Sequence, residues 1–170
     1  MHLRLNHAVL FVRDLAASLP FYRDTLGFSV APHGDDHPGA VFLRAPGSAN
    51  DHDLGLFAIG PQAQPSAAGQ RAVGLYHLAW EVDTLAELDD LRHTLTAAGA
   101  LHGASDHGMS KSLYGRDPDG LEFEIVWIVP AHLAVPRDRE AGRTIRPLEI
   151  EREIATYGHT ALSGTAQVTR

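Results

Sequence analysis

Two histidines and a carboxylate are the residues of this chain best suited to hold a metal ion together. His7 and His77 lie at equivalent points of two similar stretches, and a third, apolar stretch carries Glu122 and Glu124. Two imidazoles and one carboxylate form the facial triad that leaves metal positions open for a substrate. Side chains alternate along a strand, so Glu122 and Glu124 face the same side and both remain candidates for the third ligand.

Each of these residues also has an ordinary structural interpretation. A lone histidine is more often a hydrogen-bonded or edge-exposed polar side chain than a metal ligand. A carboxylate within an apolar strand needs a partner, however, because burial of an unpaired charge is costly. Equivalent strands of a duplicated scaffold are expected to line one shared cavity, which favours the joint interpretation as a metal site.

An internal repeat organises the elements that would position these residues. Four pairs match at a constant offset of 70 residues: Leu5/Leu75, His7/His77, Val12/Val82 and Leu15/Leu85. Each copy is typical of a strand, a helix and three further strands. The sequence therefore predicts an α+β fold with two βαβββ modules, residues 3–60 and 74–129, in one domain that spans residues 1–130.

Local signals mark the elements within each module. In the first, we expect strands over residues 5–12, 28–30, 40–44 and 52–59, with a helix capped by Asp14 in which Pro20 requires an irregular first turn or a start nearer Ser18. In the second, we expect strands over 75–82, 100–102, 113–116 and 121–128, with a capping box of Thr84 and Glu87 ahead of the helix and Gly99 beyond its end. The residues Asp-Pro-Asp-Gly at 117–120 predict a tight turn before the last strand.

Composition excludes several classes of function. The 170 residues include no cysteine, which excludes disulfides, thiolate nucleophiles and zinc fingers. The formal net charge of −7 argues against a nucleic-acid surface. Neither a membrane-spanning run nor a signal-peptide core is present, so we expect a cytoplasmic protein without a membrane partner.

Two segments lie outside the modules. Residues 61–73 have the composition of a linker. Residues 131–170 form a C-terminal extension with a short amphipathic pattern at 148–154 and a weakly structured end from Gly158. We expect this extension to lie along the surface or to be partly disordered; the alternative is that it reaches over a partner subunit.

The sequence resembles the vicinal oxygen chelate superfamily, which includes glyoxalase I, the fosfomycin and bleomycin resistance proteins and the extradiol dioxygenases. The resemblance covers residues 3 to about 129 and is carried by four stretches: Asn6–Val12, Phe21–Phe28, Tyr76–Val82 and Tyr114–Glu124. In that family the metal carboxylate follows the turn glycine by four residues, which selects Glu124 after Gly120. The resemblance implies that His7, His77 and Glu124 bind the metal on a cup-shaped mixed sheet.

Within the superfamily, the extradiol catechol 2,3-dioxygenase-like members are the most similar. Glyoxalase-like sites usually take another carboxylate from the last strand of the first module, and here residues 52–57 contain no glutamate. Instead, His52 resembles the catalytic histidine of extradiol enzymes, and His107 and Tyr114 resemble their second active-site histidine and tyrosine. The chain departs from the pattern in having one pair of modules and a shorter spacing from His107 to Tyr114.

The implied activity is ring cleavage of a catechol-type aromatic with O2 and Fe(II), with Mn(II), Zn(II) or Ni(II) as alternative metals. His52 would transfer protons, while Tyr114 and His107 would orient the substrate oxygens. The alternatives are a glyoxalase-type isomerase or thiol transferase on the same scaffold, and a resistance protein that sequesters a small molecule without catalysis. By analogy with the family we expect a homodimer, with modules paired within or between chains.

Overall fold

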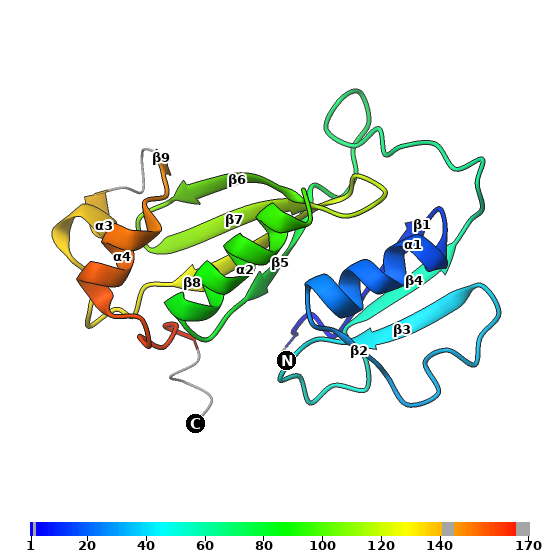
Figure 1. The fold of residues 1–170 in the computed structure, drawn as a ribbon, viewed down its shortest axis with the longest axis horizontal. Coiled ribbons are helices and arrows are strands. Elements are labelled where there is room, and N and C mark those ends of the chain that lie inside the picture. The colour runs from blue at the N-terminus through cyan, green and yellow to red at the C-terminus, as the bar shows by residue number, and fades with distance from the viewer. Residues whose placement is uncertain (2, 141–144, 166–170) are drawn as a thin grey trace. The chain divides into compact units, whose positions relative to one another are not determined.

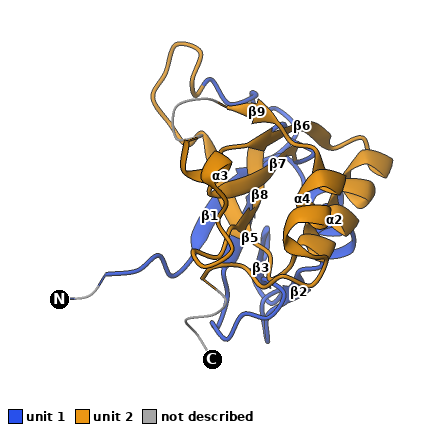
Figure 2. Cartoon of the chain, turned by 90° about the vertical axis from the view of Figure 1, so that its left-hand side faces the viewer, with its two compact units in different colours: residues 1–67, 117–120 blue, residues 68–116, 121–170 orange. Residues whose placement is uncertain are grey.

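The computed structural model describes residues 1, 3–140 and 145–165 and has a mixed α+β fold. The chain divides into two compact units, shown in separate colours in Figure 2. Unit 1 comprises residues 1–67 and 117–120, and unit 2 comprises residues 68–116 and 121–170. Among the described residues, no helix combines the length and apolar character needed to cross a bilayer.

Unit 1 contains one βαβββ module. Its elements are β1 (Ala8–Val12), α1 (Leu15–Pro20), η1 (Phe21–Thr25), β2 (Ser29–Val30), β3 (Ala40–Arg44) and β4 (Leu54–Ala58). The strands form one sheet in the order β1-β4-β3-β2, in which β1 and β4 run parallel and the other pairs antiparallel. The fold class and the module predicted from the sequence are confirmed.

Unit 2 repeats the module and adds the extension. Its elements are β5 (His77–Glu81), α2 (Leu85–Ala97), β6 (Leu101–Asp106), β7 (Ser110–Arg116), β8 (Glu122–Ile128), α3 (Pro136–Glu140), β9 (Arg146–Pro147) and α4 (Ile150–Tyr157). The sheet order is β5-β8-β7-β6-β9, again with a parallel pair, β5 and β8, formed by the first and last strands of the module. Figure 1 shows this sheet with α2 across one face.

The first strand of each module begins later than the sequence predicts. β1 starts at Ala8 rather than Leu5, and β5 starts at His77 rather than Leu75. Pairing sets these limits, because β1 is in register with β4 from the Ala8–Leu54 pair and β5 with β8 from the His77–Glu122 pair. The flanking residues Leu5 and Leu75 are exposed.

The first helix accommodates both the cap at Asp14 and the proline at position 20. Asp14 caps α1, its Oδ1 accepting from the Ala16 amide at 2.9 Å, as predicted. Pro20 ends the regular helix, since it has no N–H to donate. The chain continues as the π-helical turn η1, closed by a bond from the Leu26 amide to the Phe21 carbonyl at 3.3 Å.

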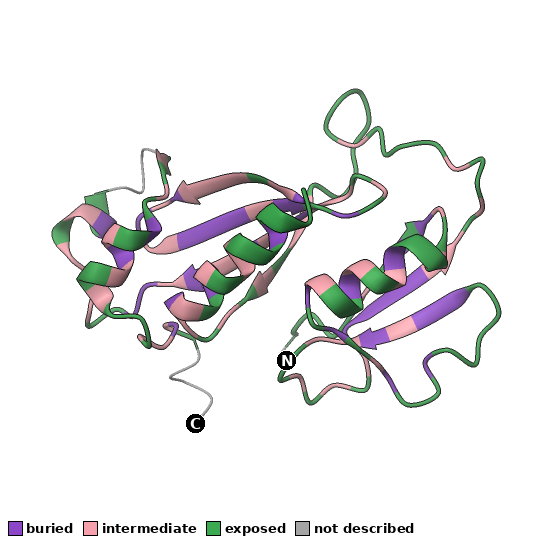
Figure 3. Ribbon diagram, viewed as in Figure 1, coloured by how far each residue is buried: buried purple, intermediate pink, exposed green. Residues whose placement is uncertain are grey.

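The core of unit 2 lies between α2 and the sheet. The predicted capping box is present, with Thr84 and Glu87 each accepting from the other's backbone amide. Buried residues follow β3, β4 and β7, whereas the outer sides of α1 and α2 are exposed (Figure 3). The fully or nearly fully buried apolar side chains of this layer are Leu85, Leu88, Leu95, Leu113, Phe123, Ile125 and Trp127.

The C-terminal extension is more structured than the sequence predicts. It supplies α3, α4 and β9, and β9 pairs with β6 at the edge of the sheet. Beyond α4, the Ser163 amide donates to the Asp83 carbonyl at 2.7 Å and the Gly164 amide to the Ile128 carbonyl at 2.9 Å. Ile150 and Ser163 are buried, so this segment completes the packing of unit 2.

The predicted turn at residues 117–120 is confirmed and is held by side chains of unit 1. The Gly120 amide donates to the Asp117 carbonyl at 2.9 Å, and Gly120 takes the left-handed φ of 81° that favours glycine. The buried Tyr22 hydroxyl donates to Asp117 Oδ2 at 3.0 Å, and Arg13 forms an ion pair with Asp119 at 3.4 Å. Burial, followed by the charge of Asp117, raises the pKa of Tyr22 well above 10.0.

The first prediction concerns this buried hydrogen bond. Tyr22→Phe should lower the free energy of unfolding by about 1–3 kcal/mol, because a buried hydrogen bond to a carboxylate is lost. Urea denaturation at pH 7 measures this change. Tyr76→Phe is the matched control, since Tyr76 is 69% exposed; an equal loss in both variants would contradict the assignment.

The raised pKa of Tyr22 also predicts a dependence on alkaline pH. Above pH 10.0 the unfolded chain loses the phenol proton while the folded chain retains it, so the stability due to Tyr22 falls as pH rises. Tyr22→Phe should therefore lose less stability between pH 9 and 11, as thermal melts at each pH will show.

Candidate active site

The open face of the unit 2 sheet carries the polar side chains of β8. Along this strand Phe123, Ile125 and Trp127 are buried on the α2 side, and Glu122 and Glu124 point to the opposite face. β5 borders β8 in parallel register and places His77 opposite Glu122, two pairs before the Ala79–Glu124 pair. The predicted alternation of faces is thus confirmed.

Contacts separate the two glutamates that alternation leaves equivalent. His77 Nε2 lies 3.1 Å from Glu124 Oε2. Glu122 instead contacts His102 Nε2 at 3.2 Å and Arg116 Nη2 at 3.6 Å. Glu124 is therefore the carboxylate beside the predicted histidine ligand, whereas Glu122 already has two other partners.

The pair His77 and Glu124 fits two neighbouring ligands of one divalent metal ion. Ligand bonds of 2.0–2.2 Å at a right angle place the donor atoms about 3 Å apart, close to the observed 3.1 Å. The donors are an imidazole nitrogen and a carboxylate oxygen, a set suited to Fe(II), Mn(II) and Zn(II). His77 Nδ1 is buried and has no hydrogen-bond partner among the described residues.

Tyr114 and His107 extend this pair into a chain of contacts. The Tyr114 hydroxyl donates to Glu124 Oε1 at 3.3 Å, and His107 Nε2 lies 2.8 Å from the same hydroxyl. Burial, followed by the charge of Glu124, raises the pKa of Tyr114, which keeps the phenol protonated as a donor. The contacts run from His77 to Glu124, then to Tyr114 and His107. All four residues predicted for the second module therefore lie together.

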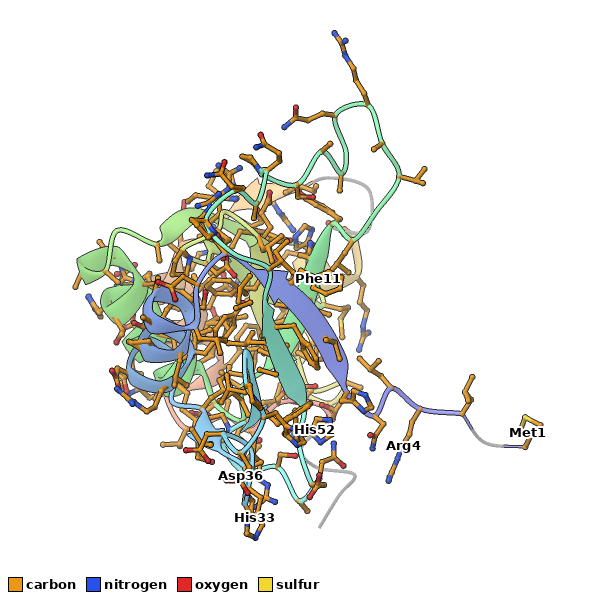
Figure 4. All side chains as sticks on the ribbon, turned by 90° about the vertical axis from the view of Figure 1, so that its right-hand side faces the viewer. Met1, Arg4, Phe11, His33, Asp36 and His52 are labelled. Carbon is orange, nitrogen blue, oxygen red and sulfur yellow. The ribbon has the colours of Figure 1, made fainter. Side chains whose placement is uncertain are left out.

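The remaining two predicted residues meet in unit 1. His7 directly precedes β1 and His52 lies two residues before β4, and their ring centroids are 4.6 Å apart. His52 Nδ1 lies 3.0 Å from Asp51 Oδ2, and the His52 ring contacts Phe42 edge to face at 5.0 Å. Figure 4 shows His52 on this unit, apart from the His33–Asp36 pair on the loop between β2 and β3.

The predicted site residues thus form two groups, one in each unit. Within the described part of the chain, no three histidine or carboxylate side chains converge as a preformed metal cluster. The ligand set of His7, His77 and Glu124 stays a prediction, as do the catalytic assignments of His52, His107 and Tyr114. The loop histidines His33 and His37 belong to neither group.

Strand register identifies the residue of unit 1 that corresponds to Glu124. Val9 pairs with Gly55 in unit 1 as Ala79 pairs with Glu124 in unit 2, and Val9 and Ala79 are equivalent in the repeat. A Cβ atom at Gly55 would meet the Phe42 ring and Val9 at 3.4 Å, so the Phe42 ring fills the adjoining space. Unit 1 therefore offers no fourth carboxylate at this position.

Two polar residues near the predicted site residues, His102 and Asp53, were not predicted from the sequence to have a role. The His102 ring is nearly parallel to that of Tyr114, at 16° and a centroid distance of 6.4 Å. A β-bulge between Leu101 and Gly103 redirects this residue, and no periodicity signals such a bulge. Asp53 accepts from the Ala45 amide, Ser48 and Asn50 and so fixes the loop before His52. In the sequence, Ser48 and Asn50 are the features that could have indicated this loop.

Comparison with known proteins places these features in a family. Residues 4–125 match the model of the Glyoxalase/Bleomycin resistance protein/Dioxygenase superfamily. The chain is similar to biphenyl-2,3-diol 1,2-dioxygenase 3 of Rhodococcus globerulus, with 33% identity over 72% of this chain and 62% of that protein. It is also similar to catechol-2,3-dioxygenase of Bacillus subtilis (strain 168), with 29% identity over 88% of this chain and 50% of that protein.

The chain therefore spans about half to three fifths of the length of these curated relatives. Among solved structures, the glyoxylase/bleomycin resistance protein/dioxygenase domain from Frankia sp. EAN1pec matches 79% of this chain and 98% of its own length. The TM-score is 0.63 and the identity 23%, so this likeness concerns the fold.

The second prediction tests the division between the two glutamates. Glu124→Gln should weaken Co(II) or anaerobic Fe(II) binding by at least about tenfold, because the carboxylate predicted to bind the metal loses its charge. Glu122→Gln, the matched control on the same strand face, should change the affinity by less than about threefold. Isothermal titration calorimetry measures both values. Equal losses, or a larger loss in Glu122→Gln, would exclude Glu124 as the ligand.

Proposed function

The chain belongs to the glyoxalase/bleomycin resistance protein/dioxygenase superfamily, and from this premise we propose that it is an Fe(II)-dependent extradiol dioxygenase. The substrate class is a catechol-type aromatic, cleaved beside its two hydroxyl groups with O2. Two similar proteins are named as dioxygenases of biphenyl-2,3-diol and of catechol, which supports this choice within the superfamily.

One observation carries the proposal, namely Gly55 at the position that corresponds to Glu124. A glyoxalase-type site with a further carboxylate from the first module would need a side chain there, and the Phe42 ring adjoins that space instead. The remaining donors are His7, His77 and Glu124, two imidazoles and one carboxylate. This is the ligand set of non-haem Fe(II) oxygenases, which keep positions open for substrate and O2.

Bound by these residues, Fe(II) would supply the Lewis acidity that lowers the pKa of a catechol hydroxyl and the redox chemistry that O2 requires. The complete set requires that His7 of unit 1 meet His77 and Glu124 of unit 2. The modules that meet can belong to one chain or to two copies of it. Mn(II) suits the same donors and is the alternative for this chemistry.

The chain's own residues would orient the substrate and move its protons. The Tyr114 hydroxyl, held between Glu124 and His107, is placed to hydrogen-bond a substrate oxygen next to the metal ligands. His52 would accept a proton from the substrate. Its Nδ1 faces Asp51 at 3.0 Å, which favours the tautomer in which Nε2 is the free acceptor.

The competing functions within the superfamily make different use of the same fold. A glyoxalase-type isomerase or a thiol transferase would use Zn(II), Ni(II) or Mn(II) and consume no O2. A sequestering protein would need no metal ligands, and the close pair of His77 and Glu124 counts against it. We also propose a cytoplasmic homodimer that acts in aromatic catabolism, and light scattering will test the oligomeric state.

The third prediction separates these functions in one experiment. The protein is reconstituted anaerobically with Fe(II) and mixed with O2 and a panel of catechol, alkylcatechols and biphenyl-2,3-diol. We expect O2 uptake in a 1:1 ratio to a yellow ring-opened product, followed with an oxygen electrode and by visible absorbance. Bound iron without O2 uptake on any catechol would exclude the dioxygenase.

The fourth prediction isolates the role of His52. His52→Ala should retain iron but lose turnover by about 100-fold or more, because a positioned acid–base group contributes about 10²–10⁴-fold. His93→Ala is the matched control, since the His93 side chain is 67% exposed on α2. Loss of thermal stability in His52→Ala with turnover retained would instead assign His52 a structural role.

A further inference from the structure

The only lysine in the chain, Lys111, is completely buried near the start of β7. Its Nζ lies 2.6 Å from Asp106 Oδ1, 3.2 Å from Asp138 Oδ1 and 3.2 Å from Glu153 Oε2. All three carboxylates are also fully buried. Asp106 ends β6, whereas Asp138 and Glu153 come from α3 and α4 of the C-terminal extension.

Arginines of the extension complete this group, which we term the Lys111 cluster. Arg137 pairs with Glu153 at 3.0 Å, and Arg146 and Arg152 approach Asp106 Oδ2 at 3.6 and 3.8 Å. Burial of several charges is tolerated only when they are paired and hydrogen-bonded. The cluster consists of Lys111, Arg137, Arg146, Arg152, Asp106, Asp138 and Glu153, with Tyr157 donating to Asp138 at 2.6 Å.

Asp106 links the cluster to the candidate site, because it directly precedes His107. Its Oδ1 accepts from the Gly108 amide at 2.8 Å as well as from Lys111. The His107 amide donates to the Ser110 carbonyl at 2.9 Å, which closes the turn between β6 and β7. Burial alone would raise the pKa of Asp106, but the bonds from Lys111 and Gly108 outweigh it and lower that pKa.

The extension also contacts Asp106 through backbone pairing. β9 pairs with the end of β6, and Arg146 lies directly opposite Asp106 in the register. Asp106 is therefore fixed by a strand pair, by the Arg146 side chain and by Lys111. From the turn that Asp106 fixes, His107 reaches the Tyr114 hydroxyl at 2.8 Å.

We infer that the C-terminal extension is a positioning element of the candidate site, and that the Lys111 cluster sets the turn from which His107 contacts Tyr114. This inference rests on the proposed function insofar as it gives the His107–Tyr114 pair a role in turnover. The residues of the cluster are positioning residues, because they act on the substrate only through His107. Neither the repeat nor the metal ligands would require such an extension.

The activity test uses Arg146→Gln, because Arg146 is partly exposed and its loss leaves Lys111 in place. We expect kcat to fall about tenfold, since small misplacements of a catalytic group cost this much or more, with KM for catechol and iron content unchanged. Arg139→Gln is the matched control, an exposed arginine of α3 that changes the charge equally. Arg146→Lys should restore part of kcat.

A double-mutant cycle distinguishes positioning from a general loss of structure. If Arg146 acts through His107, Arg146→Gln should lower kcat in the wild-type background but not in His107→Ala. An equal fold-loss in both backgrounds would overturn the inference. Circular dichroism and thermal melts of all four proteins verify that each is folded.

A measurement without turnover keeps the inference separate from the proposed function. In ¹H–¹⁵N spectra, Arg146→Gln should shift the Gly108 amide signal and speed its hydrogen exchange, while Arg139→Gln leaves both unchanged. The single lysine adds a second readout. Lys111 should be acetylated by acetic anhydride faster in Arg146→Gln than in wild type, with the terminal amine as the internal reference in mass spectra.

The two proposals then fail in different ways. If Arg146→Gln alters the Gly108 signals while no catechol supports O2 uptake, the dioxygenase proposal falls and the positioning of the turn stands. If O2 uptake is found but Arg146→Gln leaves kcat and the Gly108 signals unchanged, the positioning role is overturned.

Discussion

The parallel pairing of the first and last strands within each module is the constraint on which the candidate site depends. Parallel neighbours require a crossover, and here α1 or α2 with the two middle strands provides it. The pairing carries residues from opposite ends of a module to adjacent strands. It brings His7 to His52 in unit 1 and His77 to Glu124 in unit 2. Neither pair is close in sequence, so both depend on β1–β4 and β5–β8 registers that a shift by one residue would destroy.

Unit 2 distributes its polar and apolar groups so that the site remains on one face. The α2 side of the sheet is filled by large apolar side chains such as Trp127, and the opposite side presents Glu122 and Glu124. The Lys111 cluster lies at the N-terminal end of β7, where the extension covers the sheet. There, full burial of the carboxylates is balanced by Lys111 and the surrounding arginines. Removing the extension would expose Lys111 and Asp106 to water and free the turn that carries His107.

Most of the fold could be predicted from the sequence, because caps and turns are determined by residues that are close together in the chain. The capping box of Thr84, the cap at Asp14 and the turn at Gly120 each involve residues within a few positions of one another. Features set by distant residues were not accessible. Alternation could not separate Glu122 from Glu124, since the distinction lies in His102 and His77 on other strands. The order of the extension likewise comes from buried charges on β6 and β7, which its own composition does not reveal.

Comparison of the two modules supports Glu124, rather than Glu122, as the proposed metal carboxylate. Register makes Asp53 the counterpart of Glu122, and both serve neighbouring structure, Asp53 through the loop before His52 and Glu122 through His102 and Arg116. The next position on the same face differs between the modules, being Gly55 in one and Glu124 in the other. Glu124 contacts His77 and Tyr114, which are themselves predicted site residues. A duplicated scaffold with a structural carboxylate in both modules, and with a glutamate at the next position in only one of them, can thus supply a single metal carboxylate. That number fits a facial triad better than a four-ligand site.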